Sequence, residues 1–467
     1  MIRRPIATLN RLFPRGAMRR SVIPISLTVL AAVAVTPTIA RAQHLRDKIS
    51  QLFVFGDGQE PLFLAGSATA SNPASVKAHG NHYIPAAVGE NGSIIGFLVG
   101  SLGASVGNVP IGATASGETF RFEGGVPIST ATSAGPIFGE RGQTLGRGRM
   151  LVGMNRSSFQ FSTLRGIPMS NIGLTFTHEN VDYPGCAADN GGLDCKKLGV
   201  PLLENETMAF NLNLDINVQV SSFYATFGLT DRIDIGVVVP LTQASVTGRS
   251  DAQINPFGPP PAAHFFAGSS DNPVLTAARN ITGSAFGVGD VAARLKVNAY
   301  RSPKTFIAFM ADARFPTGDA QDLLGSGSFA LRTLAIASSR FGDFSPHVNA
   351  GYLYHAGPTQ NDAVLATVGF DHLLGPSVTL GADIVSEFQV GTSKLRLPQS
   401  VTFDYPYRRS VNTTSIPDMR DNILNGSLGF KFAASKNTLV VTNAIIPLNR
   451  GGLRANQTYT LGIEYGF

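Results

Sequence analysis

The sequence predicts an all-β fold, a transmembrane antiparallel up-and-down β-barrel that follows a plug-like N-terminal segment. Three observations favour this class. Apolar and polar residues alternate with a period of two over many segments of about ten residues. Short connections between these segments alternate with long ones. The chain has 51 glycines and 30 phenylalanines but only 15% charged residues, which suits strands that meet lipid with every second residue.

The alternation defines twelve predicted strands, an even count that places both ends of the barrel's chain segment on the periplasmic side of the membrane. A further strand at Ile172–Thr177 leaves fourteen as an alternative count. Segment 206–228 is overlong and changes phase near Phe223, which predicts a bulge. The twelve segments are 149–162, 206–228, 232–246, 286–299, 304–315, 328–339, 344–356, 362–372, 376–390, 423–433, 438–448 and 457–467.

The last segment shows the alternation most clearly. Its apolar and aromatic face carries Tyr459, Leu461, Ile463, Tyr465 and Phe467. Its other face carries Thr458, Thr460, Gly462, Glu464 and Gly466. We expect the first face to meet lipid and the second to line the lumen. Upstream strands share the pattern, so the apolar set from Phe210 to Val218 is expected outside as well.

The connections distinguish a barrel from a soluble β-sandwich, which also alternates. Barrels of the outer membrane have short turns at one rim and long loops at the other, whereas a sandwich has no reason to segregate loop lengths. The short turns are Thr230-Asp231, Arg301–Lys304, Gly342-Asp343, Leu374–Pro376 and Ser435–Asn437. The long loops are 179–205, 248–283, 316–327 and 391–422. This segregation favours the barrel.

Residues 1–42 have the three parts of a secretory signal peptide. Arginines precede an apolar run from Val22 to Val35, and Ala40-Arg41-Ala42 offers a cleavage site. The apolar run is too short for a membrane-spanning helix. This segment holds seven arginines and no acid, so its removal leaves 30 basic and 31 acidic residues. The basic pI of 9.4 therefore belongs to the export signal, and nucleic acid is excluded as a partner.

Residues 43–148 differ from the predicted barrel of residues 149–467. Leu45–Phe55 has apolar residues at helical spacing and predicts a short helix. The Gly-, Ala- and Ser-rich stretch that follows is too apolar for a disordered linker. Two placements are open, a plug inside the lumen or a periplasmic segment, and the plug is preferred because plugged barrels are common. As a plug, the segment would bring Glu118, Glu123 and Glu140 to basic residues of the inner wall.

Charged residues at inward-facing strand positions are the candidates for the lumen lining. They are Asp290, Arg294, Lys296, Asp312, Arg314, Arg332, Asp371, Asp383 and Glu387. Two interpretations remain equally open: the charges pair with one another and fill a polar interior, or they line a transport path.

Two features of the sequence suggest covalent chemistry. Cys186 and Cys195 are the only cysteines, and in an exported chain they predict a disulfide that closes a small loop. Gly103–Gly107 matches the G-x-S-x-G pattern around Ser105, but it lacks the strand, turn and helix that raise a nucleophile. We therefore predict that the chain is not an enzyme and uses no cofactor or metal.

Three stretches carry a resemblance to a known family. They are GLTDRIDIGVVVPL at 228–241, GVGDVAARLKV at 287–297 and PTGDAQDLLGSG at 316–327. Together they resemble the outer-membrane transporter family named after the meta-pathway of phenol degradation, which is similar to the FadL-like channels for fatty acids and aromatic hydrocarbons. The resemblance covers roughly residues 206–467. It implies an N-terminal hatch inside the barrel, and it supplies no catalytic residues.

The expected function follows from the barrel, the plug and this resemblance. We expect a passive channel in the cell outer membrane that admits small hydrophobic molecules, either aromatic compounds or fatty acids. Its expected partners are membrane lipid, the solute, and the barrel-assembly machinery acting through Tyr459–Phe467. The alternatives are a general porin for polar solutes, a structural or adhesive surface barrel, and a barrel-embedded lipase that uses Ser105.

Overall fold

The computed structural model describes residues 43–53, 55, 101, 120–123, 126–129, 133–177, 206–258, 265–269, 271–397, 400–403 and 407–467. The chain divides into two units, Met1–Gln43 and His44–Phe467, and the helices and strands all belong to the second. The predicted signal peptide, both cysteines and the stretch around Ser105 lie outside the described residues.

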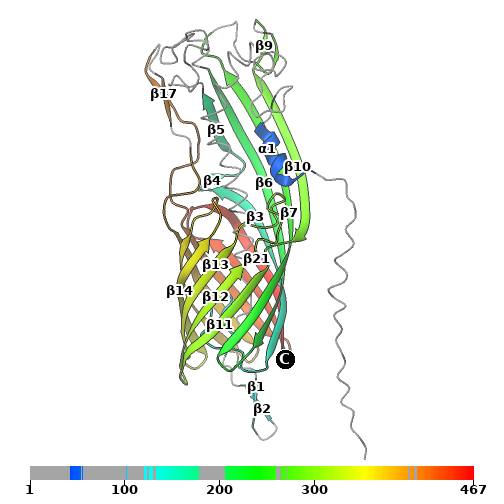
Figure 1. Cartoon of the computed structure of the whole chain (residues 1–467), viewed down its shortest axis with the longest axis vertical. Helices are drawn as coiled ribbons and strands as arrows, with labels where there is room; N and C mark the ends of the chain where they lie inside the picture. Colours follow the sequence, from blue (N-terminus) through cyan, green and yellow to red (C-terminus); the bar gives the residue numbers. More distant parts are fainter. Residues whose placement is uncertain are drawn as a thin grey trace, which may run out of the picture. The chain divides into compact units, whose positions relative to one another are not determined.

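Twelve antiparallel strands close into a barrel, as the sequence predicted (Figure 1). They are β3 (Met150–Leu164), β6 (Thr207–Gly228), β7 (Ile233–Asn255), β11 (Ala292–Arg301), β12 (Thr305–Arg314), β13 (Ala330–Ser339), β14 (Phe344–His355), β15 (Ala363–Gly375), β16 (Val378–Gln389), β19 (Ile423–Ala433), β20 (Thr438–Pro447) and β21 (Leu453–Gly466). Pairing of β21 with β3 closes the ring. Closure satisfies the backbone groups within the wall, which a membrane requires because lipid offers no hydrogen bonds.

The two ends of the barrel differ in their connections. All five predicted short turns join consecutive strands at one end, called here the short-turn end, where β3 begins and β21 finishes. The longer connections lie at the opposite, long-loop end. The predicted segregation of loop lengths is therefore confirmed.

The wall is apolar outside and polar inside. On β11, Leu295 is 46% exposed whereas its neighbour Lys296 is 5% exposed. On β21, Leu461 is 62% exposed and Glu464 only 1%. Exposed apolar side chains around a polar interior reverse the arrangement of a soluble protein and match a barrel whose outer surface meets lipid.

Strands β6 and β7 continue past the barrel at the long-loop end (Figure 1). Along β3, β6 and β7 the inward and outward faces exchange their polarity. The register pairs Met154 of β3 with Phe223 of β6, and Phe223 with Val239 of β7. On the short-turn side of this level the outward residues are apolar. Beyond it they are polar, as at Gln219 and Gln243, and the inward residues are apolar. The outer surface thus changes from lipid-facing to water-facing at this level.

This exchange corrects two predictions for β6. The apolar residues from Phe210 to Val218 do not face lipid, because Phe210, Ile216 and Val218 are buried in the interior of the extension. The change of phase near Phe223 is no bulge, because the register of β6 with both neighbours is continuous there. β6 keeps its regular pairing along its length, and only the medium that surrounds its outward face changes.

β10 (Thr276–Val288) corrects a further boundary. The predicted strand 286–299 is two elements, since β10 pairs with the outer half of β7 and β11 with its inner half. The predicted loop 248–283 consequently contains the end of β7 and most of β10. β5 (Ile172–Thr177) is a strand, but it pairs only with the outer part of β6 and adds no member to the barrel. Fourteen strands are therefore excluded.

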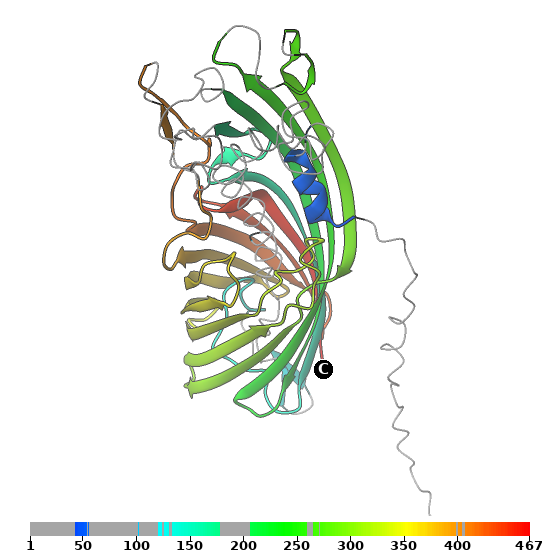
Figure 2. The ribbon, with the colours of Figure 1, turned by 45° about the horizontal axis from the view of Figure 1, so that its top comes forward.

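The predicted helix 45–55 is shorter than expected. α1 (Leu45–Ser50) passes into a 3₁₀ turn, η1 (Gln51–Phe53), and both lie beside β7 and β10 of the extension (Figure 2). Phe55 packs against Phe210, with ring centroids 5.3 Å apart. No helix in the described part of the chain is long and apolar enough to span a membrane.

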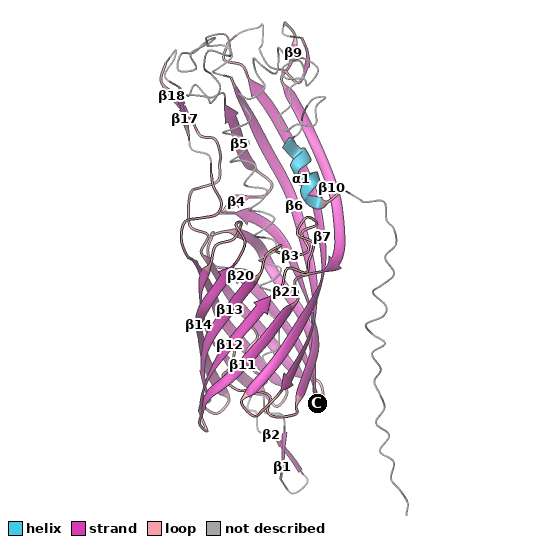
Figure 3. Ribbon diagram, in the orientation of Figure 1, coloured by secondary structure: helices cyan, strands magenta, loops and turns pink. Residues whose placement is uncertain are grey.

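The remaining strands are short and lie outside the barrel wall (Figure 3). They form hairpins or pair with one wall strand: β1 (Phe120–Glu123) with β2 (Val126–Ser129), β4 (Ile167–Pro168) with β3, β8 (Ala267–Gly268) with β9 (Pro273–Val274), and β17 (Val401–Phe403) with β18 (Arg409–Val411).

Candidate functional site

A chain segment without regular structure, residues 133–149, runs through the barrel interior and is called here the luminal segment. Its backbone N–H groups donate hydrogen bonds to inward side chains of several barrel strands. Ala134 N donates to Thr379 of β16 at 2.9 Å, Gly142 N donates to Ser338 of β13 at 3.0 Å, and Leu145 N donates to Asp234 of β7 at 3.0 Å. The wall thus supplies the partners that an irregular backbone needs at membrane depth.

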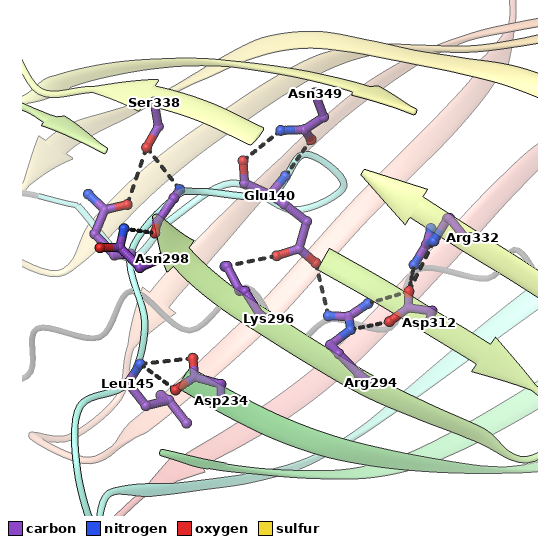
Figure 4. A network of polar contacts seen from close by, with 12 residues as sticks. Glu140, Leu145, Asp234, Arg294, Lys296, Asn298, Asp312, Arg332, Ser338 and Asn349 are labelled. Atoms are coloured by element: carbon purple, nitrogen blue, oxygen red, sulfur yellow. Dashed lines mark hydrogen bonds and ion pairs between the residues drawn. The ribbon is translucent and has the colours of Figure 1, made fainter. Parts of the chain in front are cut away.

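Glu140 is the centre of the contacts between this segment and the wall (Figure 4). Its carboxylate accepts from Arg294 Nη1 at 2.9 Å and from Lys296 Nζ at 3.3 Å. Asp312 then receives two hydrogen bonds from Arg294 and is also bound by Arg332. Three bases therefore meet two acids in this network, and every side chain except the partly exposed Arg332 is at most 6% exposed. Such a network is stable only when each charge keeps its partner.

Arg141 makes the next contact, in the direction of β15. Its Nε donates to Asp371 Oδ1 at 3.0 Å, and its Nη2 also pairs with Asp371. Ser133 donates to the same carboxylate. The side chains of Arg141 and Asp371 are 4% and 0% exposed, so this ion pair depends on the luminal segment remaining in place.

Two glycines allow the segment to lie this close to the wall. A Cβ on Gly139 would come within 2.0 Å of His347 Nε2, and a Cβ on Gly142 within 2.7 Å of the backbone of Phe306. His347 itself is bound to Asp383 at 2.7 Å, and Asp383 also accepts from Phe138 N. Close packing on a polar wall therefore requires glycine at these positions.

Three other predicted lumen residues, Asp290, Arg314 and Glu387, lie toward the long-loop end of the barrel. Asp290 precedes β11 and holds a loop, since it accepts from Gly318 N at 3.0 Å and from Ser326 N at 2.7 Å. Arg314 ends β12 and interacts electrostatically with Asp290, Asp312 and Glu387. Glu387 of β16 lines a cavity at the long-loop end.

This cavity has a mixed lining of apolar and polar groups. Its apolar lining includes Phe138 of the luminal segment and Phe159 and Phe161 of β3. Phe159 and Phe161 also belong to the apolar core of the extension. The polar lining includes Arg454 and Ser427. The cavity therefore lies between the apolar extension and the polar, filled lumen.

A buried arginine fixes the loop beside the cavity. Arg165 follows β3, and its guanidinium donates to both carboxylate oxygens of Asp421 at 2.7 and 2.8 Å, to Ser393 Oγ at 2.7 Å and to Pro417 O at 3.1 Å. Its side chain is completely buried. Arg165 has φ +48°, so its backbone is held in a left-handed conformation that non-glycine residues rarely adopt. The long connection between β16 and β19 is thereby anchored to the barrel.

One cluster among the described residues has the spacing of metal ligands. His44 Nδ1 lies 3.3 Å from Asp322 Oδ2 and 3.9 Å from Asp319 Oδ2. All three side chains are partly exposed, and Asp322 also accepts from Leu45 N at 3.0 Å. These contacts join the start of α1 to the loop 316–327, and ion pairing explains them.

Sequence reasoning missed several members of the site. Ser338 and Asn349 lie at inward positions of strands that had been recognised, and the alternation could have identified them. Arg454 was not identifiable, because β21 begins at Leu453 and the predicted strand began at residue 457. Phe138 was not identifiable, because the luminal segment has no periodicity.

Comparison with known proteins supports the predicted resemblance. Residues 204–395 match a family model described as the MetA-pathway of phenol degradation. This stretch contains the three motifs on which the resemblance rested. No curated protein matches the chain.

Comparison with solved structures finds a channel, a FadL homologue and a transporter. An outer membrane channel from Pseudomonas putida F1 is 13% identical, with 70% of this chain and 98% of that chain covered and a TM-score of 0.38. A FadL homologue from Pseudomonas aeruginosa is 12% identical, covering 68% and 90%, with a TM-score of 0.31. The toluene transporter TbuX from Ralstonia pickettii is 12% identical, covering 69% and 90%, with a TM-score of 0.23.

Proposed function

We propose that this protein is a passive outer-membrane channel for small hydrophobic molecules, either aromatic compounds or fatty acids. The observation that carries the proposal is the order of environments along the molecule. An apolar core in the extension adjoins a cavity lined by Phe159 and Phe161, and a polar lumen filled by the luminal segment follows. Apolar solutes cross a lipopolysaccharide layer poorly, and this order offers them an apolar entry.

The luminal segment acts in this proposal as a plug that excludes water-soluble molecules. Its contacts with β7, β11, β13, β14, β15 and β16 support that role. The wall charges Arg294, Lys296 and Asp312 are engaged in ion pairs rather than facing open water. A general porin needs a water-filled lumen, so the same contacts weigh against that alternative.

Export and insertion complete the proposal. Residues 1–42 are removed as a signal peptide, Cys186 and Cys195 form a disulfide, and the barrel-assembly machinery receives the chain through Tyr459–Phe467. The outward face of β21, with Tyr459 59% exposed, and Phe467 directly after it, 63% exposed, support the last point.

Uptake by cells tests the function. Cells with and without the gene would be given labelled ethylbenzene and, separately, labelled arabinose. The gene should raise the rate of ethylbenzene uptake several-fold and leave arabinose uptake unchanged. Higher arabinose uptake with unchanged ethylbenzene uptake would contradict the proposal and indicate a general porin instead.

A further inference from the structure

Arg454 occupies an unusual position in the cavity at the long-loop end. It lies near the start of β21 and is only 5% exposed, yet it lines the cavity. Its Nη2 donates to Leu424 O at 3.0 Å and to Asn425 Oδ1 at 2.5 Å. These two acceptors on β19 hold the guanidinium in place.

Its Nε has no such partner. The atom is buried and makes no hydrogen bond. A buried N–H without an acceptor costs about 1–3 kcal/mol, and more when the group is charged. Because the Arg454 side chain lines the cavity, an occupant that supplies an acceptor beside this side chain can satisfy the Nε atom.

Ser427 presents a second unused group in the same cavity. It lies two residues after Asn425 on the inward face of β19, and it is 6% exposed. Its Oγ is buried and without a hydrogen bond. Residues i and i+2 of a strand point to the same side of the sheet. Ser427 therefore lies on the same face as Asn425, which binds Arg454, and both residues line the cavity.

The charges of the lining determine which acceptor fits. Asp362, Glu387 and Asp421 contribute three carboxylates, whereas Arg454 is the one arginine among the lining residues that the structure describes. Asp421 is paired with Arg165, so a bound carboxylate would add a negative group to a cavity that Asp362 and Glu387 also line. A neutral oxygen accepts from Arg454 Nε without this repulsion.

We infer that the cavity binds an amphipathic molecule with an apolar body and a neutral oxygen head, a hydroxyl or a carbonyl. The body lies against Phe138, Phe159 and Phe161, and the head accepts from Arg454 Nε with Ser427 Oγ beside it. This inference rests on the proposed function and narrows its solute class: oxygenated neutral molecules are preferred over hydrocarbons and over carboxylates.

Binding to the purified full-length protein in detergent tests the inference. Three ligands share one body and differ in the head: 4-ethylphenol, ethylbenzene and 4-ethylbenzoate. Titration calorimetry should give 4-ethylphenol about tenfold tighter binding than ethylbenzene, because the head satisfies a charged donor, and 4-ethylbenzoate the weakest. Arg454→Met should lose this advantage and leave ethylbenzene binding unchanged.

Two further variants exclude a general loss of structure. Ser427→Ala removes an unbonded hydroxyl, so it should fold normally and weaken 4-ethylphenol binding severalfold. Arg450→Met, at an exposed arginine nearby, should bind as wild type. Equal affinity for 4-ethylphenol and ethylbenzene, tighter binding of 4-ethylbenzoate, or no binding of any of the three would each overturn the inference. Cell uptake of ethylbenzene would still decide the proposed function separately.

Discussion

The carboxylate of Glu140 lies between Arg294 and Lys296, at 2.9 and 3.3 Å from their donor nitrogens. The acid belongs to the luminal segment and both bases belong to β11, so this contact joins the segment to the wall. All three side chains are 5–6% exposed. At Glu140 the luminal segment is therefore held by ion pairs that are sheltered from water.

Glu140→Gln should loosen the luminal segment. Breaking a buried ion pair by removing one charge costs about 3–5 kcal/mol, and Arg294 and Lys296 would both lose the carboxylate between them. Single-channel recordings in planar bilayers should show larger and more frequent openings than wild type. Asp343→Asn, at an exposed turn residue, is the control and should leave the currents unchanged. Wild-type currents in Glu140→Gln would mean that this contact does not close the lumen.

Two neighbouring substitutions test which side chains of β11 face lipid and which face the lumen. Leu295→Arg directs a charge into lipid and should cost about 2–4 kcal/mol near the midplane. Lys296→Ala removes an inward group and should be much milder, because Glu140 keeps Arg294. The measurement is the folded fraction after assembly into liposomes, read from heat-modifiable mobility. Normal assembly of Leu295→Arg together with failure of Lys296→Ala would reverse the facing.

The level of Met154 and Phe223 should mark the edge of the membrane. The chain has no tryptophan, so a single introduced tryptophan reports its own surroundings. Phe223→Trp and Asn217→Trp both place the probe on the outward face of β6. Brominated lipids should quench the first and not the second. Equal quenching at both positions would place the apolar extension inside the membrane.

Arg165 should control the order of the connection between β16 and β19. Arg165→Lys cannot reproduce the paired hydrogen bonds to Asp421 together with those to Ser393 and Pro417. We expect faster proteolysis between 390 and 422 with the barrel intact. Arg249→Lys, at an exposed surface pair, should be cut as wild type. Unchanged cleavage in Arg165→Lys would show that the loop is held by other contacts.

Intact mass tests the predictions for residues that the structure does not describe. The mature protein should lack residues 1–42 and gain the mass of two hydrogen atoms when a reducing agent opens the bond between Cys186 and Cys195. Detection of residues 1–42, or of two free thiols before reduction, would refute the corresponding prediction.

The sequence predicted the barrel because alternation and loop lengths are local properties. Twelve strands and the facing of Leu295 and Lys296 follow from them directly. Alternation identifies two faces of a strand but does not say which medium each face meets. Alternation alone therefore places Phe210 and Val218 toward lipid, although they are buried in the extension that β6 passes through before it enters the barrel wall.

The site was less accessible to sequence reasoning because it joins distant parts of the chain. Inward charges such as Arg294 and Asp312 were visible as strand residues. Their pairing with Glu140 depends on the path of a segment without periodicity. The cavity likewise depends on β3 meeting β21, which brings Phe159 close to Thr458.

Liposome swelling in arabinose tests most directly whether the N-terminal region closes this barrel to polar solutes. The full-length protein and a variant that lacks residues 43–148 would be compared at equal amounts of inserted barrel. Strand pairing alone closes the wall, so the truncated barrel should still assemble. The account predicts no swelling with the full-length protein and rapid swelling with the truncated one. Equal swelling by the two proteins would contradict it.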